Sequence, residues 1–444
     1  MTAARTQRSR GLVGNSFALL ATTHITALLG YAFWTVCARV FSPSVIGITN
    51  TAISAMTLIS VIAISGFIPM LTRLLPGASP EERSGLCSTA FVVATLVPGI
   101  AGTIGALFMP DRLRAVVGTP WLMVLLGTGT ATTALLLVVN AALLGVRRAD
   151  LSMYSNIVGS IARLGAVATM LVLGVLAVSM DAKASHTILI VWIVSLFISI
   201  VLSMWLLIRT APGFRFHAHW VWFSRMRDSL GWDHVTTLAI RAPPLAIPIL
   251  AASMFPPAQV GYLAVVGMVV SAFLAVAASI SSALLADCAD DPRRLQEQAR
   301  RATRLICMLL VVPVMVTCLL AKEVLSFFGT EYATYSPLLI LLLICTFPDA
   351  LINVAVAVLR VQHRLAVITT LAVIGTIMSI GGSWVLMPHM GLYGIGVALL
   401  VSQGLSAIVF AVIVLWPHRL RSSAANGEAR TEQSKPKMIG TGLA

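Results

Sequence analysis

The chain has 444 residues, of which 58% are hydrophobic and only 10% are charged, and it carries a formal net charge of +14 at pH 7. Soluble domains carry about 25% charged residues, so this composition excludes a soluble globular protein. Apolar runs recur from Leu12 almost to Trp416, and each is long enough to cross about 30 Å of hydrocarbon as a helix. The alternation typical of transmembrane β-strands is absent, which predicts an all-α polytopic membrane protein.

We predict about twelve transmembrane helices. In chain order they cover residues 12–37, 44–70, 86–109, 120–145, 152–179, 187–209, 233–255, 260–286, 305–327, 336–360, 365–387 and 391–416.

The longest loop inside this array divides the chain into two halves of six helices. We therefore expect a cytoplasmic N-terminal tail over 1–11, a six-helix bundle over 12–209, a linker over 210–232, a second bundle over 233–416 and a disordered tail over 417–444. The linker mixes aromatic residues with arginines, which indicates an amphipathic helix at the cytoplasmic interface or a docking site for a partner protein.

A short sequence repeat supports this division into halves. Residues 41–47 read FSPSVIG and residues 255–261 read FPPAQVG, so that a Phe, a Pro and a Gly recur at one offset of 214 residues. Each copy ends one apolar run and starts the next. The offset is near half the chain length, which indicates an ancient duplication of a membrane module, an arrangement common among transporters.

The basic residues predict the orientation in the membrane. With a cytoplasmic N-terminus, the inner segments hold 23 of the 30 Lys and Arg residues, the outer segments hold 5, and 2 lie within the spans. This excess follows the positive-inside rule and places both termini in the cytoplasm. We therefore attribute the net charge to topology and to contact with anionic membrane lipids, and expect no nucleic-acid partner.

No catalytic, nucleotide-binding or metal-binding motif is found. The six cysteines are scattered without close spacing, so we expect no metal site and no cofactor. A P-loop and the common hydrolase motifs are absent, which argues against an ATP-driven pump. The predicted outer loops are short, whereas an enzyme acting at the outer face usually needs a sizeable outer loop for its catalytic groups.

Ionisable residues at bilayer depth are expensive and are therefore functional candidates. Arg163 and Asp349 fall near the middle of the fifth and tenth spans, and Arg241 lies about two turns into the seventh. Asn353 follows Asp349 by one helical turn on the same face. We predict that Arg163, Arg241 and Asn353 bind substrate and that Asp349 couples transport to an ion. The alternative is a structural ion pair between Asp349 and one arginine.

His24 lies mid-way along the first span and is a further candidate for substrate binding. It can equally be a packed, hydrogen-bonded histidine or a proton carrier.

The seventh span contains Pro243, Pro244 and Pro248 within six residues. Each proline removes a backbone hydrogen bond, so we expect a kink or an unwound segment. Interrupted helices at membrane depth are tolerated where they line a cavity or move. We therefore predict that these prolines form a gate beside Arg241, with a static kink as the alternative.

Two stretches resemble bacterial polysaccharide flippases of the multidrug/oligosaccharidyl-lipid/polysaccharide exporter superfamily. Residues 38–76 carry an Arg-x-x-x-Pro-x-x-x-Gly segment, here Arg39, Pro43 and Gly47, and end in an Arg-Leu-Leu-Pro segment at 73–76. Residues 327–364 resemble the boundary between spans nine and ten of that family. The matching positions there are Gly329, Tyr332, Leu359, Arg360 and Gln362.

The resemblance implies two six-helix bundles related by an axis along the membrane normal. It also implies a flippase that moves an undecaprenyl-diphosphate-linked glycan between the leaflets of the bacterial cytoplasmic membrane, linked to protons, sodium or the membrane potential. A cationic cavity between the bundles holds the diphosphate in that family, and Arg163 is similar to the basic residue often found in its fifth span. Glycan-assembly proteins are the implied partners.

Two other functions stay open at this point. A multidrug cation antiporter of the same superfamily would need acidic groups in its cavity, and Asp349 offers one. A membrane-embedded polysaccharide polymerase or ligase would need a large outer loop, which the sequence does not provide.

Overall fold

The computed structural model describes residues 25–172, 181–210, 214–218, 221, 232–288 and 295–415. Ten of its helices are long and apolar enough to cross a membrane, and Ile25–Val40 is a shorter apolar helix. No strand occurs in the described residues. The prediction of an all-α polytopic membrane protein is therefore confirmed.

The N-terminal half contains eight described helices. They are Ile25–Val40, α2 (Pro43–Ile64), α3 (Phe67–Leu74), α4 (Pro80–Gly105), α5 (Asp111–Val117), α6 (Thr119–Gly145), α7 (Ala149–Val172) and α8 (Asp181–Thr210). The predicted first and fifth spans correspond to Ile25–Val40 and α7, which are not among the ten long apolar helices.

The C-terminal half begins at α10 and is also built from helices alone in its described part. They are α10 (Trp232–Met254), α11 (Pro257–Cys288), α12 (Leu295–Leu319), α13 (Ala321–Ser326), the 3-10 helix η4 (Thr330–Tyr335), α14 (Ser336–Ile344), α15 (Thr346–Val361), α16 (Leu365–Met390) and α17 (Tyr393–Leu415).

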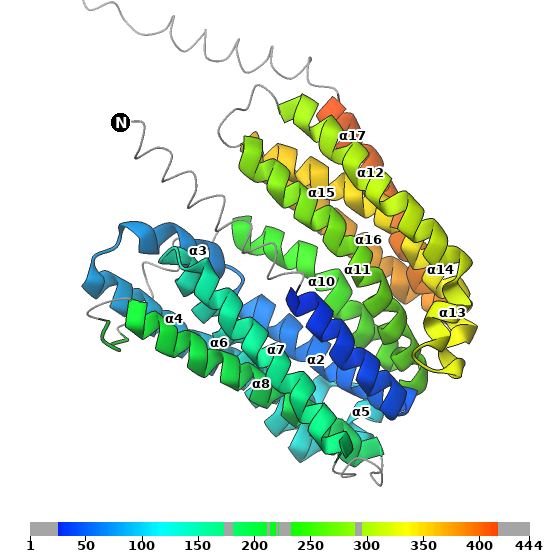
Figure 1. Cartoon of the computed structure of the whole chain (residues 1–444), viewed down its shortest axis with the longest axis horizontal. Coiled ribbons are helices and arrows are strands. Elements are labelled where there is room, and N and C mark those ends of the chain that lie inside the picture. The colour runs from blue at the N-terminus through cyan, green and yellow to red at the C-terminus, as the bar shows by residue number, and fades with distance from the viewer. Residues whose placement is uncertain are drawn as a thin grey trace, which may run out of the picture.

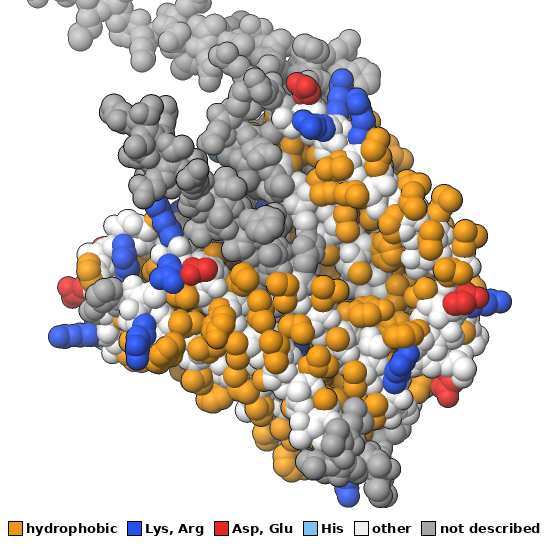
Figure 2. Space-filling model, viewed as in Figure 1, with side chains coloured by type: hydrophobic (Ala, Val, Ile, Leu, Met, Phe, Trp, Pro, Cys, Tyr) orange, Lys and Arg blue, Asp and Glu red, His pale blue; other side chains and the backbone are white. Residues whose placement is uncertain are grey.

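The two halves form two lobes that meet at one end and diverge at the other (Figure 1). They meet where α2 and α11 begin, and they diverge toward the end that carries α3 and the last turns of α17. Hydrophobic side chains cover the flanks of both lobes, whereas Lys, Arg, Asp and Glu gather near the two ends (Figure 2). This distribution suits a belt of lipid around the middle of the molecule.

The repeated sequence lies at the crossing of the two lobes. A methyl group added to Gly47 would overlap the carbonyl oxygen of Pro257, and one added to Gly261 would overlap the carbonyl oxygen of Pro43. The two copies thus contact each other reciprocally, backbone to backbone, and only glycine allows this approach. The reciprocity is what a two-fold relation between the halves requires.

A second equivalence appears in the hairpin turns after α6 and after α15. Arg147 and His363 both adopt a left-handed backbone conformation, with φ of 61° and 56°. In each turn the next N–H closes onto a carbonyl five residues earlier, Arg148 onto Leu143 and Arg364 onto Leu359. This is the Schellman arrangement that ends helices. The shared turn extends the repeat beyond the short sequence match.

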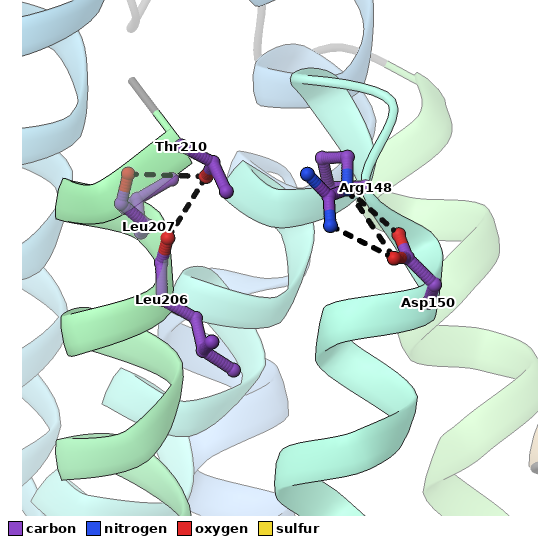
Figure 3. Close-up of polar contacts among 5 residues, drawn as sticks. All are labelled: Arg148, Asp150, Leu206, Leu207 and Thr210. Atoms are coloured by element: carbon purple, nitrogen blue, oxygen red, sulfur yellow. Dashed lines mark hydrogen bonds and ion pairs between the residues drawn. The ribbon is translucent and has the colours of Figure 1, made fainter. Parts of the chain in front are cut away.

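The first of these turns also carries an ion pair (Figure 3). The Arg148 side chain donates hydrogen bonds to both carboxylate oxygens of Asp150 at 3.0 and 3.3 Å, which ties the turn to the first residues of α7. Nearby, the Thr210 hydroxyl donates to the carbonyl oxygens of Leu206 and Leu207 and so satisfies two backbone acceptors at the end of α8.

The prolines of α10 do not unwind the helix, so of the kink or unwound segment that we expected, the unwound segment is not found. α10 is helical from Trp232 to Met254, through Pro243, Pro244 and Pro248. Pro243 cannot donate to Ala239, and the Thr376 hydroxyl of α16 donates to that carbonyl oxygen instead. The neighbouring helix thus replaces one of the lost backbone bonds, as is common for prolines in membrane helices.

The interruption occurs in the predicted tenth span instead. α14 ends at Ile344 and α15 begins at Thr346, so the chain turns at Cys345. Pro348 lacks the N–H that would have reached Ile344, which explains why a continuous helix is disfavoured there. The turn places Asp349 in the first turn of α15, where its backbone N–H donates to the carbonyl oxygen of Cys345 at 3.2 Å.

The linker between the halves is described only over residues 214–218 and at 221, and residues 214–218 form no helix. The backbone N–H groups of Arg215 and His217 donate to the hydroxyls of Ser84 and Ser88 in α4, at 3.2 and 3.1 Å. These residues are therefore attached to the N-terminal lobe. Most of the predicted amphipathic helix falls outside the described residues, and that prediction stays open.

Candidate functional site

Arg163 lies within the N-terminal lobe, fourteen residues after α7 begins, which corresponds to about 21 Å of helix. Its guanidinium lies 3.7 Å from the ring centroid of Trp192 and 5.7 Å from that of Phe33. Its Nε donates a hydrogen bond to the Ser195 hydroxyl at 2.9 Å. The cation is thus held by two aromatic rings and one neutral hydroxyl.

The residues around Arg163 come from two neighbouring helices. Trp192 and Ser195 are three residues apart on α8 and therefore share one face. Phe33 belongs to the helix Ile25–Val40 and is almost fully buried, at 1% exposed. Phe33 and Trp192 also contact each other, with ring centroids 6.0 Å apart. We refer to Phe33, Trp192 and Ser195 as the arginine cage.

The cage leaves part of the guanidinium unused. Arginine has five N–H donors, and only the Nε donor of Arg163 has a partner among the described residues. The four terminal donors form the planar fork that suits phosphate and carboxylate oxygens. Among the described residues, Arg163 is therefore held by the cage and its fork has no partner.

Asp349 and Asn353 occupy one face of α15, as the sequence predicts. The Asn353 side-chain amide donates to both the Asp349 backbone carbonyl and the Asp349 carboxylate, each at 2.9 Å. Both side chains are half-buried. A carboxylate supported by a neighbouring amide can exchange a proton or bind a cation.

The structural ion pair considered from the sequence does not form. Asp349, Arg163 and Arg241 make no ion pair with any described residue, and the partners of Asp349 and Arg163 are neutral groups. The lone acid and the caged arginine are held separately, each by groups of its own lobe.

Arg241 shares α10 with Pro243, Pro244 and Pro248. Its side chain is exposed and makes no hydrogen bond or ion pair with a described residue. The structure therefore places Arg241 beside the predicted gate but does not bring it to Arg163 or Asp349. At the start of the same helix, His234 Nδ1 lies 2.7 Å from the hydroxyl of Ser65, which follows α2. His24 lies outside the described residues.

Sequence reasoning missed the arginine cage and Thr376. A cation buried at mid-membrane needs partners, and a Trp and a Ser three residues apart in a neighbouring span are a signal that could have revealed them. In the part of the chain that the structure describes, no three His, Cys, Asp or Glu side chains gather in a way that could hold a metal ion.

No protein-family model matches the sequence, and no curated protein does. Solved structures do match the fold. An inward-facing multidrug resistance MATE family transporter of the MOP superfamily superposes with a TM-score of 0.71 at 14% identity, covering 93% of this chain and 99% of that chain. The chain has the fold of MOP-superfamily transporters. The lipid II flippase MurJ, in an inward closed conformation, gives 0.73 at 13% identity, covering 89% of this chain and 87% of that chain.

The fold superposes better on the inward-facing transporter structure than on an outward-facing one. An outward-facing MATE transporter of the MOP superfamily gives a TM-score of only 0.53 at 15% identity, although it covers 94% of this chain and 96% of that chain. This comparison agrees with lobes that meet at the end where α2 and α11 begin. The match also confirms the MOP-type fold that the sequence motifs suggested, with two lobes in a multi-pass membrane protein.

Proposed function

We propose that this protein is a flippase that moves an undecaprenyl-diphosphate-linked oligosaccharide across the bacterial cytoplasmic membrane by alternating access. The observation that carries the proposal is the caged Arg163, a cation in the apolar part of the chain that no described acid neutralises. A protein retains such a charge at considerable cost, and an anionic substrate supplies the missing counter-charge.

In this proposal the free fork of Arg163 takes one phosphate of the diphosphate by paired hydrogen bonds. Lysine would keep the charge but lose the planar fork, so arginine suits this role better. Arg241, Asn353 and His24 are the further substrate-binding residues that we propose. The lipid tail stays in the surrounding membrane while the anionic head and its sugars cross between the lobes.

The same proposal assigns the remaining predicted residues. Asp349 couples the cycle to an ion, because its carboxylate is half-buried, supported by Asn353 and not paired with a described cation. Pro243, Pro244 and Pro248 weaken the backbone of α10 and form a gate that bends when the lobes move. Both termini lie in the cytoplasm, and the partners are membrane lipids and the proteins that assemble the glycan.

The test is a flipping assay in vesicles that contain the full chain and a short oligosaccharide linked to undecaprenyl diphosphate. We expect Arg163→Ala to abolish the substrate's movement to the opposite leaflet at normal protein abundance, and Arg163→Lys to retain part of it. Arg209→Ala is the matched control. Like Arg163, Arg209 lies over the ring of an α8 tryptophan, here Trp205 at 4.7 Å, but it does so near the end of α8. Wild-type flipping by a well-folded Arg163→Ala protein would refute the proposal.

A multidrug cation antiporter is the second candidate. The observation in its favour is the half-buried Asp349 without a described cation, since a carboxylate in this position can bind a cationic drug in exchange for a proton. The same vesicles loaded with a cationic dye separate the two functions. Export of the dye that depends on Asp349 and not on Arg163 would favour the antiporter.

A further inference from the structure

A side-chain contact joins the two lobes at the end where they meet. Arg39, near the end of the helix Ile25–Val40, donates a hydrogen bond from Nε to the carbonyl oxygen of Phe327 at 2.8 Å. Its guanidinium also lies 3.9 Å from the centroid of the Phe327 ring. Phe327 follows α13 in the C-terminal lobe, so this contact spans the two lobes.

Neighbouring contacts add to the attachment at this end. Tyr31 meets the buried ring of Phe328 edge to face, with centroids 5.9 Å apart. The backbones of α2 and α11 cross at Gly47 and Gly261. Toward the opposite end of the molecule the lobes diverge (Figure 1), although the contact between Ser65 and His234 still joins them past the end of α2.

The two kinds of contact differ in a way that suits motion. At its closest point the glycine crossing brings backbone against backbone, and Val45, Ile46 and Val260 beside it are buried in a core that both lobes share, so this contact stays packed. The Arg39 contact is different, because both Arg39 and Phe327 are exposed and a single guanidinium makes it. Such a contact adds modest stability to one state and breaks readily.

We infer that Arg39 and Phe327 form a latch that holds the lobes together at this end, with the Gly47–Gly261 crossing as its pivot. The inference rests on the proposed alternating access, in which this end must open. Arg39 belongs to the Arg-x-x-x-Pro-x-x-x-Gly segment, and the latch gives that motif a physical role: its arginine fastens the lobes and its glycine lets them pack closely at the pivot. The anion site uses neither residue.

The test measures the distance across the latched end with fluorescent or spin labels. Lys183 in α8 and Thr334 in η4 are exposed, and labelled cysteines at these positions, with the native cysteines replaced by alanine, report on the two lobes. We expect Arg39→Gln to raise the ratio of open to closed molecules roughly tenfold, because it removes the cation–π contact and the charged donor together. Arg39→Lys keeps the charge and should give an intermediate ratio.

Lys322→Gln is the matched control, since Lys322 lies in α13 and makes no contact with a described residue that involves its charge. It should leave the ratio unchanged. An unchanged ratio in Arg39→Gln, or an equal change in Lys322→Gln, would overturn the latch. Arg163→Ala separates this inference from the proposed function: its labelled ends should still open and close like the wild type even if it has lost flipping.

Discussion

The two lobes solve the problem of a buried charge in different ways. The N-terminal lobe holds the cation of Arg163 against Trp192 and Phe33 and gives it one neutral hydroxyl. The C-terminal lobe holds the Asp349 carboxylate beside a helix interruption, where the Asn353 amide supports it. Aromatic faces attract cations, whereas amide donors favour anions.

This difference indicates that the opposite charges of Arg163 and Asp349 do not form an ion pair with each other. If they neutralised each other, each would need little local support, and neither would be available to a ligand. Because each lobe supports its own charge, the two can act on different ligands, an anionic substrate and a coupling ion. Substitutions at either charge and at its supporting groups can break or sharpen this separation.

The largest effect should come from Arg163→Ala combined with Asp349→Asn. We expect the single Arg163 variant to bind a prenyl diphosphate roughly 10- to 100-fold more weakly, since hydrogen bonds to charged groups contribute about 1.5–3 kcal/mol. Adding Asp349→Asn should not restore the binding, because the two residues do not interact in the structure. Calorimetry in detergent measures both. Recovery of binding and abundance in the double variant would instead reveal an ion pair.

The Asp349–Asn353 contact should contribute to the unfolding free energy of the protein. Asn353→Leu leaves the half-buried carboxylate without its described amide donor, which should cost about 1–3 kcal/mol of unfolding free energy. Replacing both residues by Leu should be nearly neutral, because no buried polar group is then stranded. Thermal unfolding in detergent compares the variants, and a double variant less stable than the single one would contradict this view of the pair.

The aromatic support of Arg163 should have a smaller effect. Trp192→Leu removes the closest ring and should weaken prenyl-diphosphate binding about 2- to 30-fold, the range expected for a cation–π contact of about 0.5–2 kcal/mol. Trp192→Phe should be milder. Trp205→Leu is the control, because Trp205 stacks under Arg209 near the end of the same helix. Equal losses at both positions would point to a general defect of α8.

The membrane-spanning architecture and the same-face pair Asp349–Asn353 could be predicted from the sequence, because hydrophobic length and helical spacing are local properties. Prediction failed where a tertiary contact decides. Three prolines in α10 predicted a kink or an unwound segment, yet the helix continues without unwinding and Thr376 of α16 takes up a freed carbonyl. The tenth span was predicted as one helix over 336–360, yet the helix is interrupted at Cys345.

For the candidate site, too, local properties could be predicted from the sequence and tertiary contacts could not. Depth along a span identified Arg163 as a candidate without its environment, because the arginine cage comes from α8 and from Ile25–Val40, and only the packing of three helices brings it together. The repeat indicated a duplication, whereas the structure shows in addition that its glycines touch. Contacts between distant segments are what a single sequence leaves open.

The smallest effect concerns the Arg148–Asp150 ion pair, which lies outside the membrane. Its contribution to stability can be compared with that of the polar contacts inside the membrane. The hydrogen bonds from Arg148 lower the pKa of Asp150 below its ordinary value of 3.8. A lowered folded-state pKa means stability that is present above the unfolded pKa and is lost as pH falls through the folded value. Both side chains are more than a third exposed, so solvent screening should limit the contribution of the pair to less than about 1 kcal/mol.

We expect Asp150→Asn to lower the unfolding free energy slightly at pH 7 and to be indistinguishable from wild type near pH 2. In a protein that already carries Arg148→Gln, adding Asp150→Asn should not change the unfolding free energy at either pH. A larger loss at pH 7 than that of Asn353→Leu would mean that surface pairing, and not local support of buried charge, dominates the electrostatics of this fold.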